Sequence, residues 1–112
     1  RNSQWHLLVE QAGEYEIELR RWPRDADAPI AAGVPKFVAV AGEMPAGKAL
    51  PIARARLKIG DRFDEARTVD ADDRGITFTT TLPAGRTTMQ SWFYDATGED
   101  LCGAYFAYVR RK

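Results

Sequence analysis

The sequence is short of the residues from which many enzyme active sites are built. Its 112 residues include one histidine, His6, and one cysteine, Cys102. A single cysteine excludes a disulfide within the chain and a zinc site made of four cysteines. We predict that His6 lies on the outer face of an edge strand without a catalytic role. We predict that Cys102 is buried and structural, because no cationic neighbour in the sequence activates its thiol.

The sequence also lacks net charge, because 16 Lys and Arg residues balance 16 Asp and Glu residues. This balance gives no indication of a nucleic-acid partner. No apolar run approaches the roughly 20 residues of a membrane-spanning helix, so we expect no membrane partner. No signal peptide is recognisable. The chain starts at Arg1 and opens almost directly on an apolar strand, so we expect it to be a piece of a larger or processed polypeptide.

One acidic stretch resembles a calcium-binding loop but lacks two of the ligand residues that such a loop needs. Asp70, Asp72 and Asp73 in DADDRG resemble the start of an EF-hand loop. The fifth position of that loop is Arg74 and the twelfth is Thr81, where an EF-hand has an oxygen ligand and a bidentate Glu. We therefore predict an acidic β-turn, and we assign no catalytic and no metal-binding residue to the chain.

Apolar residues recur at every second position in several segments, which predicts β-strands with one buried face. In GEYEIELRRWP (13–23), three apolar residues alternate with three glutamates. The alternation breaks at Arg21 and Trp22, so we predict that the strand leaves the sheet there. The predicted strands are 5–9, 14–22, 36–42, 53–60, 65–70, 75–85, 86–95 and 103–111.

The predicted fold class is all-β, an antiparallel β-sandwich of jelly-roll-like form. Strands recur at spacings of about ten residues, and no amphipathic helix accompanies them. The length indicates a single domain spanning 1–112. Residues 23–51 contain five prolines and three glycines. They predict a long irregular loop, with one helical turn expected at 25–33.

The outward-facing residues suggest which strands pair and which are covered. Strand 14–22 exposes three glutamates and strand 53–60 exposes three cations. Opposite charges on neighbouring strands contribute roughly 0.2–1 kcal/mol per pair, so we predict that these strands are neighbours. WFY (92–94) and AYFAYV (104–109) are apolar at both alternating positions. We expect such strands either at the centre of the sandwich or against another domain.

Four segments of the chain form a recognisable series, and these are 5–30, 48–60, 82–95 and 98–111. Their most specific parts are LRRWP (19–23) and CGAYF-x-YVRR (102–111). Taken in order, the segments resemble the C-terminal portion of bacterial arylsulfatases. Sulfatases hydrolyse sulfate esters of carbohydrates or aryl alcohols. Their chemistry resides in an N-terminal α/β domain, where a Cys or Ser in a C/S-x-P-x-R motif becomes formylglycine beside a calcium ion. That motif is absent from this sequence.

The resemblance therefore implies a non-catalytic accessory domain of a sulfatase. We expect it to pack on the catalytic domain of the same polypeptide and to help shape the substrate cleft. We expect calcium and formylglycine in that catalytic domain and no cofactor in this chain. The family also implies a secreted or periplasmic enzyme.

An alternative is a carbohydrate-binding module. The segment 13–20 also resembles a strand of jelly-roll sugar-binding domains. Trp22, with Arg20, Arg21 and Arg24, would suit a sulfated or carboxylated glycan, because guanidinium groups pair bidentately with such oxyanions. The interpretation we favour is that Trp22 closes the end of the sandwich, the following proline stops the strand, and the arginines pair with acidic residues. A general protein-interaction domain is a third possibility.

Overall fold

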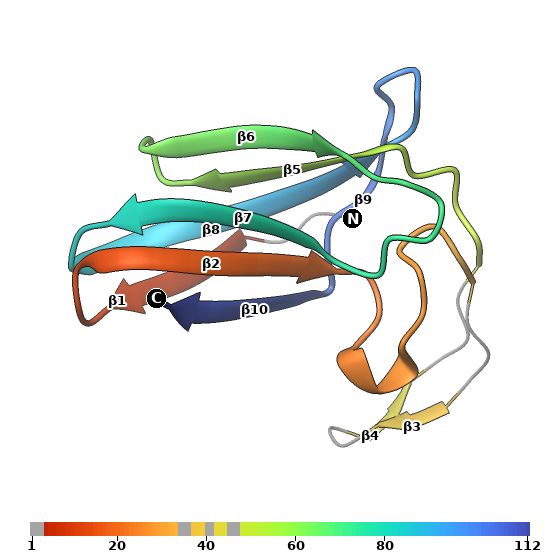
Figure 1. The fold of residues 1–112 in the computed structure, drawn as a ribbon, viewed down its shortest axis with the longest axis horizontal. Helices are drawn as coiled ribbons and strands as arrows, with labels where there is room; N and C mark the ends of the chain where they lie inside the picture. Colours follow the sequence, from red (N-terminus) through yellow and green to blue (C-terminus); the bar gives the residue numbers. More distant parts are fainter. Residues whose placement is uncertain (1–3, 34–36, 40–41, 45–47) are drawn as a thin grey trace.

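The computed structural model describes residues 4–33, 37–39, 42–44 and 48–112. Two antiparallel sheets pack face to face (Figure 1), which confirms the predicted β-sandwich. The strands are Gln4–Val9 (β1), Gly13–Arg20 (β2), Phe37–Ala39 (β3), Gly42–Met44 (β4), Arg54–Ile59 (β5), Phe63–Thr68 (β6), Ile76–Leu82 (β7), Gly85–Tyr94 (β8), Asp100–Cys102 (β9) and Phe106–Arg111 (β10). One short 3-10 helix, Arg24–Ala26 (η1), follows β2.

The strands divide into a larger and a smaller sheet. The larger sheet has the order β1-β8-β5-β6, with β9 also paired to β8. The smaller sheet has the order β10-β2-β7, and β3 and β4 form a separate two-stranded sheet. Strand β8 is therefore central, as one of our alternatives for 92–94 expected, whereas β10 is an edge strand. Strand β9 was not predicted from the sequence.

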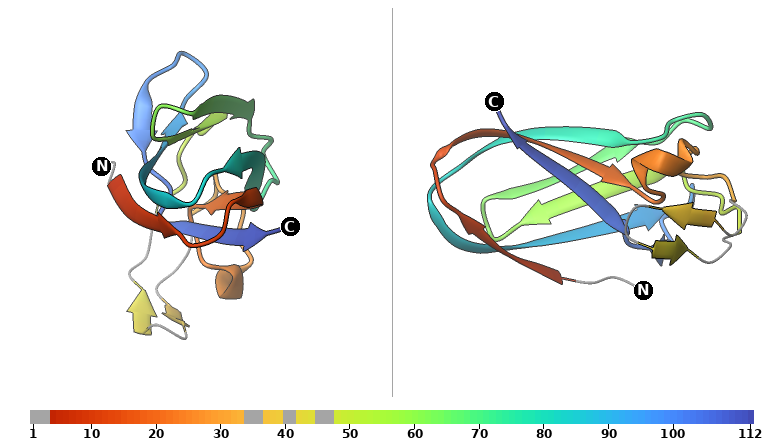
Figure 2. Two further views of the ribbon diagram at one scale, coloured as in Figure 1. Left: turned by 90° about the vertical axis from the view of Figure 1, so that its left-hand side faces the viewer. Right: turned by 90° about the horizontal axis from the view of Figure 1, so that it is seen from below.

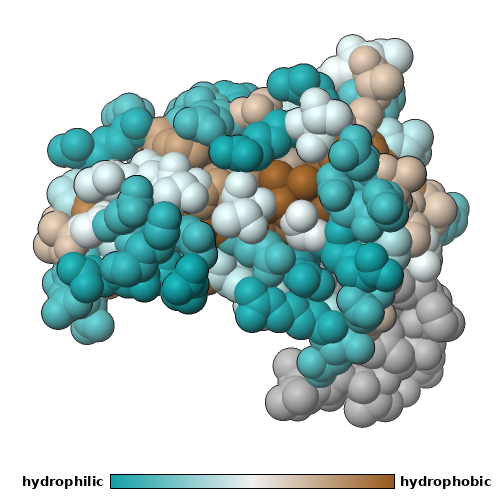
Figure 3. All heavy atoms as spheres, in the orientation of Figure 1, coloured by the Kyte–Doolittle hydropathy of each residue, from teal (hydrophilic) through white to brown (hydrophobic). Residues whose placement is uncertain are grey.

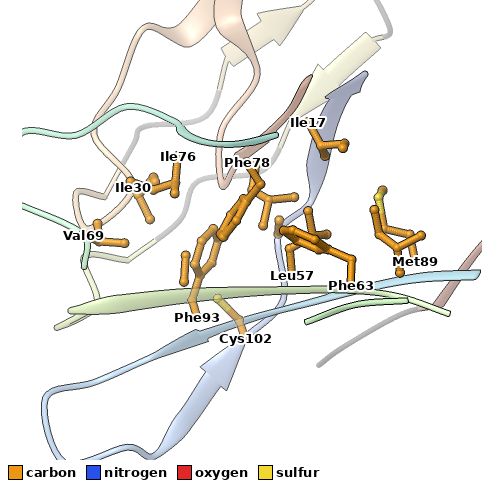
Figure 4. Packing of buried hydrophobic residues seen from close by; sticks show 14 of the residues in the cluster. Ile17, Ile30, Leu57, Phe63, Val69, Ile76, Phe78, Met89, Phe93 and Cys102 are labelled. Atoms are coloured by element: carbon orange, nitrogen blue, oxygen red, sulfur yellow. The ribbon is translucent and has the colours of Figure 1, made fainter. Parts of the chain in front are cut away.

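The core lies between the two sheets and is built from the inward-facing residues of the alternating strands (Figure 4). Phe78 of β7 and Phe93 of β8 are both 0% exposed. The rings of Phe63 and Phe78 meet edge to face, with their centroids 6.2 Å apart. Full burial of each such side chain contributes about 1.5–3 kcal/mol, so these residues supply much of the stability of the sandwich.

The prediction that strands 14–22 and 53–60 are neighbours is wrong, because β2 and β5 lie in different sheets. Two of the three outward-facing glutamates of β2 are instead matched by cations near the C-terminus. Glu16 forms an ion pair with Arg110, and Glu14 with Lys112 at 3.4 Å. The cations of β5 face β6, where Asp64 lies opposite. The glutamates of β2 are therefore complementary in charge to more than one strand, and their charge alone did not identify the neighbouring strand.

The loop predicted for 23–51 contains some regular structure. The helical turn expected at 25–33 is present as η1, which begins one residue earlier. In the region where a strand was predicted at 36–42, 37–39 forms β3, and Gly42 begins β4. Positions 36, 40 and 41 lie outside the described residues.

The chain crosses from the larger to the smaller sheet between β9 and β10 (Figure 2). The backbone N–H of Ala104 donates to Oγ of Ser91 on β8 at 2.9 Å. Ser91 is 1% exposed, so this hydrogen bond satisfies a polar group inside the core. It also fixes the crossing point immediately before Tyr105, whose side chain is exposed.

Candidate functional site

Two of the residues predicted to bind a glycan, Arg20 and Arg24, lie on the outer face of the smaller sheet around Glu18. Arg20 Nη2 donates to Glu18 Oε2 at 3.3 Å, and Arg24 Nη2 to Glu18 Oε1 at 2.9 Å. Partial burial raises the pKa of Glu18, but the hydrogen bonds and charges of the two arginines outweigh it and leave that pKa below its ordinary value. The Arg24 guanidinium also lies over the Tyr108 ring, 4.0 Å from its centroid.

The other two predicted residues, Arg21 and Trp22, are buried beneath the loop that follows β2. Arg21 is 4% exposed and Trp22 is 5% exposed. Arg21 Nη1 donates to the carbonyl oxygens of Ile30 and Ala32 at 3.2 and 3.3 Å, and its Nη2 donates to the carbonyl oxygen of Lys48. Trp22 Nε1 donates to the Ala32 carbonyl oxygen at 2.9 Å. Both side chains therefore seat the loop against the end of the sandwich.

This arrangement separates residues that the sequence placed together. Trp22 does not form an exposed aromatic platform, and its ring is packed against the Arg21 guanidinium, 4.4 Å from the ring centroid. The interpretation that Trp22 closes the sandwich end agrees with this geometry. The expectation that the arginines pair with acidic residues holds for Arg20 and Arg24 but is wrong for Arg21, which donates to backbone carbonyls.

The histidine and the cysteine lie on opposite faces of the larger sheet. His6 is exposed on β1, which is an edge strand as predicted. Cys102 is 3% exposed and belongs to the core. Burial raises the pKa of the Cys102 thiol, with only partial opposition from the nearby charge of Arg21. Cys102 is therefore a buried core residue, as the sequence predicted.

The acidic stretch near residue 70 forms a turn, as predicted. The Asp73 backbone N–H donates to the Asp70 carbonyl oxygen at 3.1 Å, and the Asp70 backbone N–H donates to Asp73 Oδ2 at 2.7 Å. Within the described ranges, no group of three His, Cys, Asp or Glu side chains is arranged to hold a metal ion. The same part of the chain contains no helix long and apolar enough to cross a membrane.

The edge strands β1 and β10 lie on the same side of the sandwich (Figure 2, right). Apolar side chains are exposed along the seam between these two strands. These two strands are not hydrogen-bonded to each other. The seam consists of Trp5, Leu7, Leu8, Tyr105, Ala107 and Val109. Among the described residues, the exposed large hydrophobic side chains are Leu8, Tyr105 and Val109, at 59%, 53% and 49%.

The surface of the seam contains two hollows. One hollow is lined by Trp5, Leu7 and Val109 together with Met89, and the other by Leu7, Leu8 and Val109. Leu7 and Val109 line both hollows. The floor of the seam is therefore the edge of the hydrophobic core, which continues to the surface here.

The opposite side of the sandwich, between β6 and β7, is covered differently. The Arg67 guanidinium lies over the Phe78 ring at 5.4 Å from its centroid, and Phe78 is fully buried. The side of the molecule viewed in Figure 3 is mostly hydrophilic, with a small hydrophobic area near the middle of the view. Among the described residues, the exposed large apolar side chains therefore lie at the β1/β10 seam.

The sequence reasoning missed an arrangement on the outer face of the larger sheet. Trp92 and Tyr94 point away from the core, in register with Arg56 and Arg54 of β5. The Arg56 guanidinium lies 4.5 Å from the Trp92 ring centroid. The alternation of β8 contained the signal. Met89 and Phe93 face the core, so Trp92 and Tyr94 face outward. The prediction for WFY (92–94) uses only the apolar character of these residues at both alternating positions.

Comparison of the chain with protein-family models, with curated proteins and with solved structures finds no match. The resemblance to arylsulfatases therefore remains an expectation carried by the sequence motifs. The architecture itself, an all-β sandwich, is established by the structure.

Proposed function

We propose that the chain is a non-catalytic accessory domain that packs against a catalytic domain of the same polypeptide. The observation that carries the proposal is the concentration of Leu8, Tyr105 and Val109 at one seam. Contiguous exposed apolar side chains at the edge of a core are typical of a surface that another polypeptide covers. Covering them contributes about 25 cal/mol per Å² of apolar surface removed from water.

The catalytic domain that we propose is that of an arylsulfatase, in line with the motifs of the chain. In that enzyme, formylglycine and calcium belong to the catalytic domain, and this chain supplies no reacting group. His6 and Cys102 lie on opposite faces of a sheet, which supports a structural role for this domain. We place the parent enzyme in a secreted or periplasmic setting, again from the family resemblance.

The experiment compares the isolated chain with the longer polypeptide that we propose contains it. The double substitution Leu8→Ser and Val109→Ser removes apolar surface from the seam. In the longer polypeptide we expect the free energy of unfolding of this domain to fall by at least about 3 kcal/mol, because two buried apolar side chains are lost. In the isolated chain, where both residues are exposed, we expect a loss below about 1 kcal/mol.

The control is Thr79→Ser on β7, which is exposed on the outer face of the smaller sheet. It should change neither free energy of unfolding. Equal effects of the double substitution in both proteins would contradict the proposal. So would dimerisation of the isolated chain through the seam in sedimentation equilibrium, because a second copy would then be the occupant.

A further inference from the structure

The outer face of the larger sheet presents a second surface, separate from the seam. On β5 the outward residues are Arg54, Arg56 and Lys58, and in register on β8 they face Tyr94, Trp92 and Gln90. Gln4 of β1 extends the last row beyond Gln90. Each row therefore places a cation beside an aromatic ring or an amide on a sheet face that no other described strand covers.

Arg56 contacts the side chains around it in the middle of this face and fixes their orientation. Its Nε and Nη2 donate to the two carboxylate oxygens of Asp64 at 2.8 and 2.6 Å. Its Nη1 donates to the Tyr94 hydroxyl at 3.4 Å, and its guanidinium stacks on Trp92. These contacts orient the two aromatic side chains before any ligand arrives. A preorganised surface of this kind loses less conformational entropy on binding.

The charges on either side of Arg56 are less completely matched. Arg54 makes no ion pair with a described residue. Lys58 lies in register with Asp64, but both oxygens of that carboxylate accept hydrogen bonds from Arg56. On the smaller sheet, by contrast, the outward glutamates of β2 all have cationic partners. The larger sheet therefore has cations available for an external anion.

This face carries more positive than negative charge, although the formal net charge of the whole chain is zero. The outward cations of the described strands β5 and β8 are Arg54, Arg56, Lys58 and Arg86, and the carboxylates beside them are Asp64 and Asp100. This gives a positive excess on one face of a chain whose formal net charge is zero. Because this excess of positive charge is small, we expect a ligand whose negative charges are widely spaced.

We propose that this face binds an acidic polysaccharide, with Arg54 and Lys58 contacting its carboxylate or sulfate groups and Trp92 and Tyr94 contacting its sugar rings. Arg54 and Lys58 are four residues apart on one strand, so their backbone positions are separated by about 13 Å. Anions at such wide intervals alternate with neutral hydroxyl-bearing units in an acidic polysaccharide. Gln90 and the Tyr94 hydroxyl are suited to those hydroxyl groups.

A nucleic acid fits this face less well, although it too combines anions with rings that stack. Each strand of a duplex carries a phosphate about every 3.4 Å, and nucleic-acid-binding domains are strongly basic as a rule. The sequence pI here is about 6.8. The spacing of the available cations and the neutral chain therefore favour the polysaccharide.

The test is calorimetric titration of the 112-residue chain with four probes. These are a chondroitin sulfate octasaccharide, the same chondroitin octasaccharide without sulfate, neutral cellohexaose and a 12-nucleotide single-stranded DNA. We expect a dissociation constant below roughly 1 mM for at least one acidic oligosaccharide, with weaker binding of cellohexaose and of DNA. Both acidic probes carry a carboxylate on every second sugar, and only one carries sulfate, so their comparison shows whether sulfate or the carboxylate is the group recognised.

Three variants locate the site. Arg54→Gln and Lys58→Gln should each weaken binding at least about threefold, as expected for loss of one charge-assisted contact. Arg110→Gln, on the outer face of the other sheet, is matched in charge and should leave affinity unchanged. Amide chemical shifts of β5 and β8 should move on titration. No binding of either acidic probe, equal weakening by Arg110→Gln, or tighter binding of DNA would each overturn the proposal, and none of these results bears on the seam.

Discussion

Ile17 of β2 and Val109 of β10 are cross-strand partners on the same inward-facing side of the smaller sheet, yet Ile17 is 1% exposed and Val109 is 49% exposed. The pleat directs both side chains towards the larger sheet. The larger sheet ends at β1, which is not hydrogen-bonded to β10. The sandwich is therefore closed over Ile17 and open over Val109.

This difference predicts unequal costs for the same kind of substitution in the isolated chain. Ile17→Ala should lower the free energy of unfolding by about 3 kcal/mol, because it leaves a cavity in the core. Val109→Ala should lower it by less than about 1 kcal/mol, because half of that side chain already contacts water. Urea denaturation measures both values, and similar losses would show that the seam is covered within the chain itself.

The seating of the loop by Arg21 and Trp22 predicts a second set of stability changes. Arg21→Lys keeps the charge but cannot reproduce the fork that reaches three carbonyl groups, so it should cost about 2 kcal/mol. Trp22→Phe removes the hydrogen bond to Ala32 and should cost about 1 kcal/mol. Guanidinium denaturation measures these losses.

A local readout separates loop release from general destabilisation. Trypsin should cleave after Lys48 faster in Arg21→Lys than in the original chain, because the hydrogen bond to the Lys48 carbonyl is lost. Arg62→Lys, at an exposed position in the β5–β6 turn, is the control. If cleavage after Lys48 is unchanged in Arg21→Lys, Arg21 does not seat the loop.

The ion pairs of Glu18 predict a pH dependence. The pKa of Glu18 is lowered in the folded state, so its stabilising contribution is present above the unfolded pKa of about 4.3 and is lost as pH falls through the folded pKa. Glu18→Gln should therefore be less stable than the original chain at neutral pH, by about 1 kcal/mol, and equally stable near pH 2. Urea midpoints at both pH values check this.

Glu65→Gln is the matched control for that series, since Glu65 is exposed on β6. It should change stability little at either pH. A difference between Glu18→Gln and the original chain that persists undiminished in acid would mean that the ion pairs are not its cause.

Burial of Cys102 predicts a thiol that is unreactive in the folded chain. Its pKa is raised by burial, so the thiolate that attacks a disulfide reagent is scarce at neutral pH. Ellman's reagent should label the folded chain at least about a hundredfold more slowly than the chain in urea, since reaction requires opening of the core. Comparable rates in the two conditions would contradict the placement of Cys102 in the core.

Much of the sandwich was predictable because local alternation determines which residues of a strand face the core. Ile76, Phe78 and Leu82 of β7 face inward as their spacing indicated. The pairing of strands was not predictable in the same way. Glutamates on β2 are satisfied by cations on β10, and equally suitable cations on β5 lie in the other sheet.

The candidate site was misjudged for a related reason. Adjacent residues Arg20, Arg21 and Trp22 look like one cluster in the sequence, but β2 ends at Arg20 and the chain then turns beneath a loop. Alternation no longer applies beyond that point, and long-range contacts with Ala32 and Lys48 decide burial. The exposure of Val109 likewise depends on where the opposite sheet ends, which no local pattern encodes.

Hydrogen–deuterium exchange of the backbone amides in β1 and β10 tests the central claim most directly. The measurement compares the isolated chain with the longer polypeptide that we propose contains a catalytic domain. If the seam is the contact surface, exchange in Gln4–Val9 and Phe106–Arg111 should slow at least about tenfold in the longer polypeptide, while exchange in β7 stays the same. Equal exchange of β1 and β10 in the two proteins would contradict the account.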